Sequence, residues 1–524
     1  MKRRDFCKGL AVTLAADALA PAAALPQAGA ATALVGRAVP DDYYTLWYRS
    51  DRCGADLRHD YYYSDSLFDH PATEYDNQLA LATLGMAAAA DCTWESDQRY
   101  WMEGEVGRAD HIRDAFAKLG FTEVQLFNYT HSLNDTPDTV GCAIARKTLV
   151  RGGRQVTIIG AFLRGSGYGA EWSGNLHAGP GSAHVGFVTA ARQLVEKIRA
   201  YVQASAKRQP LGTLKLWMGG YSRGGGVANL VAARLPAVLP QLEKKNTFVY
   251  TFAAPASLTA ADCPDLQQDY DNNHAADGSL KKNWGTSNIF NIVSSGDVIP
   301  RILPAEWGFY RNGNDRFLPS TVIPEELQAL NDRSAGMEGT PMDFGRLAVS
   351  EETDAVLRSM LDLFCDRQTY YKGYEDAMRC MLQCATTRTE EEVTRGIVRD
   401  DAAVVAQLRS MELMQRFPQE KVERCVQAAS ALSRPVLEKL GSAVPLQAQQ
   451  IVIPMLAVGL CFELQPETVQ LVADFVLSTI TVKGQLSGIL KTVLCHFQEN
   501  YITVLEAYDP ADHGMTPYTR REEL

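Results

Sequence analysis

The chain has 524 residues and a formal net charge of −11, and 46% of its residues are hydrophobic and 22% charged. This composition is ordinary for a globular protein, and the length allows a large core and two structural units. Nucleic acids and anionic membranes attract clustered Lys and Arg, so an acidic chain without a basic patch argues against both as electrostatic partners.

The N-terminus has the pattern of an export signal over residues 1–30. Arg3 and Arg4 are followed by a stretch over residues 9–24 that is mostly Ala, Leu and Val. Paired arginines before a short apolar region are typical of a twin-arginine signal, and this stretch is too short for a good membrane span. We therefore expect a mature chain outside the cytoplasm, either extracellular, at the cell surface or in the periplasm.

Helical and strand patterns alternate from about residue 75 to 300. The patterns predict helices over residues 77–90, 109–119 and 185–206, and strands over 123–127, 142–145, 155–163, 214–218, 247–252 and 288–293. Alternation of this kind predicts an α/β fold with a mixed, largely parallel sheet covered by helices.

A Gly-x-Ser-x-Gly sequence centred on Ser222 joins the strand over 214–218 to an apolar helical pattern over 227–235. Glycines at 220 and 224 fit a sharp strand-to-helix turn in which a Cβ would collide with neighbouring backbone. This order is typical of the nucleophile elbow of an α/β-hydrolase, with the serine at the top of the sheet. The alternative interpretation is a glycine-rich turn with an incidental serine.

Strand patterns stop between about residues 320 and 484. Helical patterns take their place over residues 325–330, 353–364, 390–416, 420–432 and 468–481. We therefore predict an all-helical cap insertion over 320–484, within a hydrolase core that spans 31–319 and resumes over 485–524. An apolar run over 451–462 is too short for a membrane span. Core packing is the favoured interpretation of this run, and a lid surface that meets lipid is the alternative.

The chain contains 11 cysteines, of which Cys7 lies in the predicted signal. The other ten lack regular spacing and form no Cys-x-x-Cys pair, which argues against a zinc cluster. Buried free thiols are the favoured interpretation, with some disulfides if the compartment is oxidising.

Further motifs surround the elbow in a fixed order. They are Phe-Leu-Arg-Gly-Ser over 162–166, Trp and Asn at 172 and 175, His-Val-Gly-Phe over 184–187, Thr-Phe-Ala-Ala-Pro over 251–255 and Asp-Val-Ile-Pro over 297–300. In these motifs the chain resembles the class 3, fungal-type triacylglycerol lipases and their bacterial relatives. The fourth motif departs from the family at Ala253, where the family has glycine. The resemblance covers roughly residues 150–300 and a short C-terminal match, and it implies an α/β-hydrolase fold and hydrolysis of acyl esters.

Acyl transfer needs a nucleophile, a base, a carboxylate that orients the base, and donors for the oxyanion. Ser222 is the expected nucleophile. Asp297 closely follows the strand over 288–293, so its carboxylate can lie at the same sheet edge as the elbow, and it is the expected orienting acid. The alternative for Asp297 is a turn residue in Ser-Gly-Asp.

The base is expected after Asp297, because this fold uses the chain order Ser, Asp, His. Only His496 and His513 follow it. His496 is preferred because His-x-x-x-x-Tyr at 496–501 resembles the C-terminal motif of the bacterial relatives. Apolar residues at helical spacing run through His496, at 486, 489, 490, 493, 494, 497 and 501. The alternative is therefore a histidine on a helix face, with His513 as the base.

The backbone N–H groups of Ser166 and Arg223 are the expected oxyanion hole. Glycines at 165, 167 and 169 suit a loop that a carbonyl group approaches closely. A phosphate-binding loop is the rival interpretation, but the spacing differs and Gly-Lys-Ser/Thr is missing. His184 is expected to support the loop through hydrogen bonds.

Three functions follow from these residues. The first is a secreted lipase or carboxylesterase that forms an acyl-serine intermediate without a cofactor or metal. The second is the same machinery acting on a phospholipid acyl chain, a feruloyl ester or a thioester. The third is a binding protein of hydrolase fold without catalysis. For the first two we expect a lipid or other acyl-ester substrate and transient contact of the cap with a lipid interface.

Overall fold

The computed structural model describes residues 36–50, 56–91, 104–105, 109–131, 137–167, 169–180, 183–259, 286–294, 296–303, 307–318, 358, 366–387, 392, 395–440, 446–469 and 495–507. All of them belong to one compact unit, Val35–Leu524. The predicted signal, the predicted helix over 325–330, nearly all of those over 353–364 and 468–481, and His513 lie outside the described residues.

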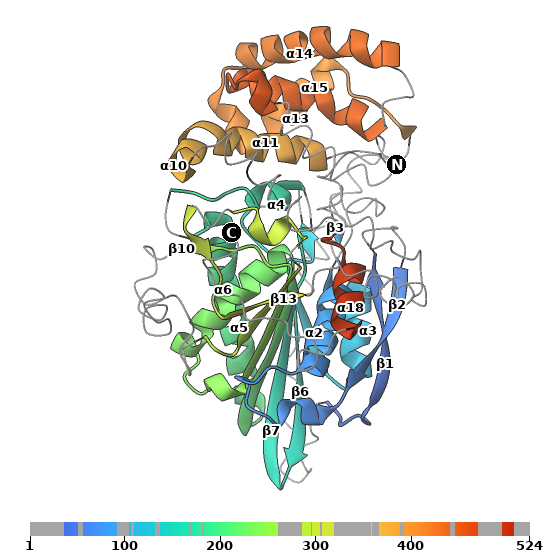
Figure 1. Cartoon of the computed structure of the whole chain (residues 1–524), viewed down its shortest axis with the longest axis vertical. Helices are drawn as coiled ribbons and strands as arrows, with labels where there is room; N and C mark the ends of the chain where they lie inside the picture. Colours follow the sequence, from blue (N-terminus) through green and yellow to red (C-terminus); the bar gives the residue numbers. More distant parts are fainter. Residues whose placement is uncertain are drawn as a thin grey trace, which may run out of the picture. The chain divides into compact units, whose positions relative to one another are not determined.

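A seven-stranded sheet with the order β13-β11-β9-β8-β7-β6-β4 forms the centre of this unit (Figure 1). Its strands are β4 (Thr122–Phe127), β6 (Cys142–Arg151), β7 (Arg154–Leu163), β8 (Thr213–Tyr221), β9 (Thr247–Phe252), β11 (Ile289–Ser294) and β13 (Asn314–Leu318). The run from β7 to β13 is parallel, whereas β6 is antiparallel to both β7 and β4. The predicted α/β fold with a mixed, largely parallel sheet is confirmed.

The strand predicted over 142–145 is longer than expected. β6 continues to Arg151 and turns into β7 through Gly152 and Gly153, whose φ angles are 54° and 73°. Two successive positive φ angles are those of a two-residue hairpin turn, and glycine adopts them without strain. The turn therefore sets the register in which Val150 pairs with Gln155.

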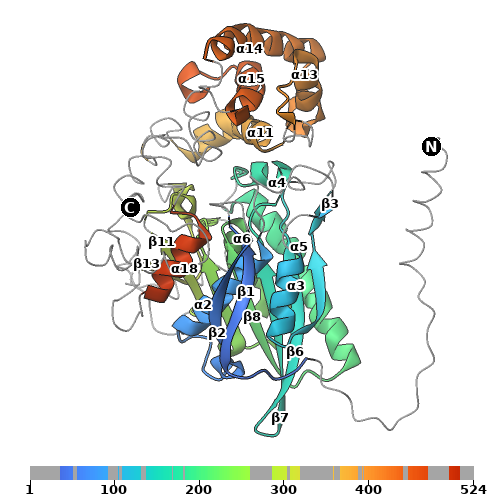
Figure 2. The ribbon, with the colours of Figure 1, turned by 90° about the vertical axis from the view of Figure 1, so that its right-hand side faces the viewer.

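Helices cover both faces of the sheet (Figures 1 and 2). One face carries α2 (Asn77–Ala90), α3 (Ala109–Lys118) and α18 (Gln498–Ala507), and the other carries α5 (Val185–Arg208) and α6 (Arg223–Val238). α2 is buried from Leu79 to Ala90, so it packs as an interior helix with an apolar side chain on nearly every side. Its small alanines let the helix approach the strands closely.

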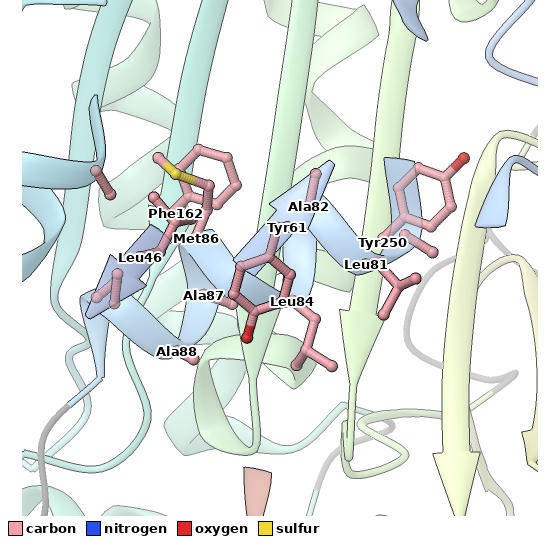
Figure 3. Close-up of a cluster of buried hydrophobic side chains, with 14 of the residues drawn as sticks. Leu46, Tyr61, Leu81, Ala82, Leu84, Met86, Ala87, Ala88, Phe162 and Tyr250 are labelled. Carbon is pink, nitrogen blue, oxygen red and sulfur yellow. The ribbon is translucent and has the colours of Figure 1, made fainter. Parts of the chain in front are cut away.

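A hairpin of β1 (Asp42–Arg49) and β2 (Asp56–Tyr63) packs on α2, and it was not anticipated from the sequence. Figure 3 shows Leu46 and Tyr61 of this hairpin in one cluster with Met86 of α2 and Phe162 of the central sheet. Both strands are rich in Tyr, which favours strands, and burial alternates along much of each strand, with Leu46, Tyr48, Tyr61 and Tyr63 on the buried face. The tyrosines and the apolar residues on one face were therefore the features of the sequence that could have predicted these two strands.

Four longer helices between residues 375 and 461 supply most of a further apolar cluster, which also includes Ala178, Ala256, Leu303 and Phe309. The helices are α11 (Glu375–Thr386), α13 (Asp401–Ser410), α14 (Gln419–Leu440) and α15 (Leu446–Cys461). In the described part of 366–469 every regular element is helical. The boundaries of the cap insertion stay a prediction.

The prediction of one helix over 390–416 was wrong. Gly396 has a φ of 67°, and the helix α13 begins only after Asp400, whose side chain accepts a hydrogen bond from the Ala403 N–H at 2.8 Å. A left-handed residue cannot continue an α-helix, and a carboxylate cap satisfies the N–H groups of a new one. Periodicity of apolar residues does not report such a break.

The apolar run over 451–462 lies mostly in α15, where Ile451, Ile453 and Val458 are buried in the helical cluster. Core packing therefore accounts for these side chains, and contact of a lid surface with lipid stays a prediction. Among the described residues no helix combines the length and apolar character that crossing a membrane requires.

Several cysteines of the described segments are thiols outside any disulfide. Cys142, Cys380, Cys384 and Cys461 are all buried, and burial raises their pKa values above the usual range. The interpretation as buried free thiols is confirmed for these four. Cys53, Cys92, Cys263 and Cys365 lie outside the described residues.

Candidate active site

The site begins at the turn between β8 and α6. Ser222 occupies this turn with φ 53° and ψ −124°, a conformation that a non-glycine residue rarely adopts. A Cβ added at Gly220 would lie 2.4 Å from the Gly224 carbonyl oxygen, and one added at Gly224 would lie 2.5 Å from that of Leu163. The expected steric reason for both glycines is confirmed, and the turn presents the serine at the carboxyl end of the strand.

His496 lies between Ser222 and Asp297. Its Nε2 is 2.9 Å from Ser222 Oγ, and its Nδ1 is 2.8 Å from Asp297 Oδ2. The three residues come from the elbow, the loop after β11 and the turn before α18, so the tertiary fold brings them together. The geometry is that of two consecutive hydrogen bonds from nucleophile to base to carboxylate. The catalytic roles of the three stay a prediction.

The helical pattern through His496 is misleading. His496 lies in a turn, and α18 begins at Gln498. The turn is held by Tyr221, whose hydroxyl donates to the His496 carbonyl at 2.6 Å, and by Asn500, whose amide donates to the Cys495 carbonyl at 2.9 Å. These side chains compete with helical hydrogen bonding of the backbone. Apolar spacing reports only which residues are buried, and it cannot distinguish a turn from a continuing helix.

The Asp297 carboxylate is fully buried and receives several donors. Oδ2 accepts from the Tyr501 hydroxyl at 2.8 Å in addition to its contact with His496, and Oδ1 accepts from the Ile299 N–H at 2.9 Å. These donors offset the cost of removing a carboxylate from water. The assignment of Asp297 as a turn residue alone leaves this set of contacts unexplained.

Tyr501 is a site residue whose contact with Asp297 is not evident from the sequence. Its hydroxyl donates to Asp297 and accepts from the Ser294 N–H at 3.0 Å. Burial raises the pKa of Tyr501 well above its usual value, so the hydroxyl keeps the proton it donates. The His-x-x-x-x-Tyr spacing singled out this tyrosine, but the spacing alone did not show that its partner is Asp297.

Ser166 and Arg223, the expected oxyanion residues, lie at the ends of adjacent strands. Leu163, at the end of β7, pairs with Gly220 of the elbow strand β8. The Asn175 side chain connects the two residues, because its Nδ2 donates to Ser166 Oγ at 2.8 Å and its Oδ1 accepts from Arg223 Nη1 at 2.9 Å. Both loops are therefore held beside the nucleophile, and their role as oxyanion donors stays a prediction.

Buried ion pairs stabilise the loop that carries Ser166. Arg164 Nη1 donates to Glu171 at 2.6 Å and to the Gly165 carbonyl at 2.8 Å, while Glu171 also accepts from the Gly167 N–H. Both charged side chains are fully buried. A buried pair that is also bonded to backbone groups restricts the loop to one conformation.

His184 has the supporting role expected of it. It is the N-cap of α5, where its Nδ1 accepts from the Phe187 N–H at 3.3 Å, and its Nε2 lies 2.9 Å from the Asn175 carbonyl. Nδ1 is an acceptor in this arrangement, so Nε2 carries the proton and donates to Asn175. His184 thereby supports the residue that connects the two expected oxyanion loops.

Full burial lowers the pKa of His184 from 6.5 to about 3. Between these values the unfolded chain binds a proton that the native chain does not, so stability falls as the pH falls, by about 1.4 kcal/mol per pH unit. In His184→Asn the cap acceptor remains but does not titrate. We expect the free energy of unfolding to depend less steeply on pH between 6 and 4 in this variant, as measured by denaturant titration. Parallel curves for both proteins would contradict the assignment.

Comparison with known proteins gives one family match. Residues 165–307 match the model of the lipase (class 3) family, a segment that contains Ser166, Ser222, Arg223 and Asp297 and ends before His496. A search of curated protein sequences gives no match. The resemblance to class 3 lipases is confirmed over this segment.

Solved structures of lipases show a limited likeness. A triacylglycerol lipase with a serine protease triad is 20% identical, with 46% of this chain and 79% of that chain covered and a TM-score of 0.30. The Rhizomucor miehei lipase–propeptide complex is 19% identical, with 46% and 68% covered and a TM-score of 0.29. A lipase from Rhizopus microsporus var. chinensis is 17% identical, with 46% and 73% covered and a TM-score of 0.29.

Proposed function

Residues 165–307 are similar to the class 3 lipases, and from this similarity we propose that the chain is a serine hydrolase that cleaves lipid acyl esters through an acyl-serine intermediate. The family match supports the coarser statement of a lipid ester hydrolase. The observation that carries the serine mechanism is the pair of hydrogen bonds from Ser222 to His496 and from His496 to Asp297, at 2.9 and 2.8 Å.

In the first half of the proposed reaction, Ser222 Oγ attacks the ester carbonyl carbon while His496 Nε2 accepts its proton. Asp297 stabilises the imidazolium that forms. The carbonyl oxygen becomes an oxyanion and accepts hydrogen bonds from the backbone N–H groups of Ser166 and Arg223. Arg223 is the first residue of α6, where the helix dipole also favours negative charge. The C–O bond then breaks, and His496 gives the proton to the leaving alcohol.

In the second half, a water molecule attacks the acyl-serine carbonyl, and His496 accepts the proton of the water. The oxyanion re-forms at the same donors and collapses, which releases the fatty acid and returns the proton to Ser222 Oγ. Tyr501 and the Ile299 N–H hold the Asp297 carboxylate throughout, because both contacts are made to the carboxylate rather than to the substrate.

The test combines a serine-reactive fluorophosphonate probe with p-nitrophenyl esters of increasing acyl length. We expect the native protein to be labelled at Ser222, as located by peptide mass spectrometry, and to hydrolyse at least one ester. Heat-denatured protein is the control and should not be labelled, because only an activated serine reacts. A folded protein that is neither labelled nor active would contradict the proposal and favour a binding protein of hydrolase fold.

We also propose export through a twin-arginine signal, which the Arg3-Arg4 pair and the apolar stretch after it support. Replacing both arginines with lysine should leave the precursor in the cytoplasm, because the transport receptor recognises the arginine pair rather than its charge. Cell fractionation with an antibody to the mature chain measures this, with Lys8→Arg as the charge-conserving control. Normal export of the double variant would indicate general secretion instead.

A further inference from the structure

Asp91 is a buried carboxylate outside the proposed triad. It follows the last residue of α2 as the C-cap, and only 3% of its surface is exposed. The C-terminal end of a helix carries partial negative charge, and burial disfavours a charged group, so this position is unfavourable for an aspartate on both counts. Its hydrogen-bond partners must compensate.

Those partners belong to the two loops on which the proposed chemistry depends. Asp91 Oδ1 accepts from the Gly165 N–H at 2.7 Å, and Asp91 Oδ2 accepts from Gln498 Nε2 at 2.8 Å. Gly165 directly precedes Ser166, and Gln498 is the second residue after His496. One carboxylate thus joins the loop of an expected oxyanion donor to the turn of the expected base.

The backbone at Gly165 is adapted to this contact. A Cβ added there would lie 2.8 Å from Asp91 Oδ1, closer than real Cβ atoms approach, so the glycine allows the carboxylate to reach the N–H. Hydrogen bonds to a carboxylate are shorter and stronger than those between neutral groups. Asp91 therefore restrains both loops more firmly than a neutral side chain of the same length would.

We propose that Asp91 is a positioning residue that holds the oxyanion loop and the His496 turn at the separation that ester hydrolysis requires. This inference rests on the proposed function. Asp91 acts through Gly165 and Gln498 and does not itself take up or release a proton in the reaction. Its effect is therefore expected in the turnover number rather than in substrate affinity, since misplacement by about 1 Å can cost about 100-fold in rate.

The chain offers a conservative variant that separates charge from geometry. Gln498 Oε1 is buried and accepts no hydrogen bond within the described residues. In Asp91→Asn the amide oxygen can still accept from Gly165, and its NH2 group can donate to Gln498 Oε1 once the glutamine amide turns over. Both connections then persist without the carboxylate, whereas Asp91→Ala loses both.

The experiment compares these variants with a soluble p-nitrophenyl ester, with active sites counted by fluorophosphonate labelling. We expect Asp91→Ala to lower kcat per labelled site about 100-fold with KM nearly unchanged, and Asp91→Asn to recover most of that loss. Asp76→Ala is the matched control, because Asp76 caps the other end of α2 by accepting from the Leu79 N–H at 2.7 Å. It should lower stability and leave kcat per site unchanged.

A folded Asp91→Ala protein with the wild-type kcat per labelled site would overturn the inference, and so would equal losses of kcat in the Ala and Asn variants. If Asp91→Ala does not fold, Gln498→Ala breaks only one of the two connections and should still lower kcat; an unchanged kcat would overturn the inference as well. An inactive, unlabelled wild-type protein would instead contradict the proposed function, which keeps the two failures distinct.

Discussion

Ser222→Ala should abolish ester hydrolysis, with kcat lower by about a million-fold, because members of a catalytic unit act together and this change removes the attacking oxygen. The fold should persist. The methyl group fits wherever the serine Cβ fits, and the backbone N–H of residue 222 still donates to the Phe252 carbonyl at 2.9 Å. The rate of p-nitrophenyl ester hydrolysis measures the loss, and circular dichroism measures the fold.

A control variant distinguishes the nucleophile from a serine elsewhere in the fold. Ser205 is fully buried in α5, whereas Ser222 is only partly buried at the elbow, so Ser205→Ala removes a serine hydroxyl away from the elbow. It should retain fluorophosphonate labelling and activity, whereas Ser222→Ala should lose both. Retention of more than about a tenth of wild-type activity by folded Ser222→Ala would refute the serine mechanism, since a unit without its nucleophile cannot keep that much.

His496→Ala should lose nearly as much activity as Ser222→Ala, because without the base the serine proton has no acceptor at 2.9 Å. The double variant should lose little more, since residues of one catalytic unit are strongly non-additive. Single-turnover and steady-state rates of the three variants, measured with the same ester, test this non-additivity. The burial of Phe497 and Tyr501 next to His496 does not depend on the imidazole, so the variant should fold.

His513→Ala is the control for the alternative base and should behave like the wild-type protein. The opposite ranking, in which His496→Ala stays active and His513→Ala does not, would transfer the proposed role to His513. A third result, equal and additive losses in both variants, would indicate that neither histidine belongs to a unit with Ser222.

Much of the architecture was predictable because its determinants are local. The predicted helix over 77–90 and strand over 247–252 coincide with α2 and β9, since apolar runs of these lengths specify their own element and its buried face. The elbow could also be predicted from local sequence, because steric contacts within the turn and with the neighbouring strand require glycine at 220 and 224. A local feature also explains why the prediction of one helix over 390–416 was wrong, because a single glycine with a positive φ, Gly396, interrupts the helix.

The sequence by itself determined the class of fold, the turn that presents Ser222 and the residues that could meet there. Only the tertiary structure decided which of them do meet. His496 and Asp297 are 199 positions apart and become partners through the docking of α18 on the sheet. Contacts between residues so far apart in sequence produce no periodic pattern of residues, because they depend on how several helices and strands pack together. The contact of Tyr501 with Asp297 also depends on this packing. So does the position of Asp91 between the Gly165 loop and the His496 turn, and neither could be inferred from the sequence.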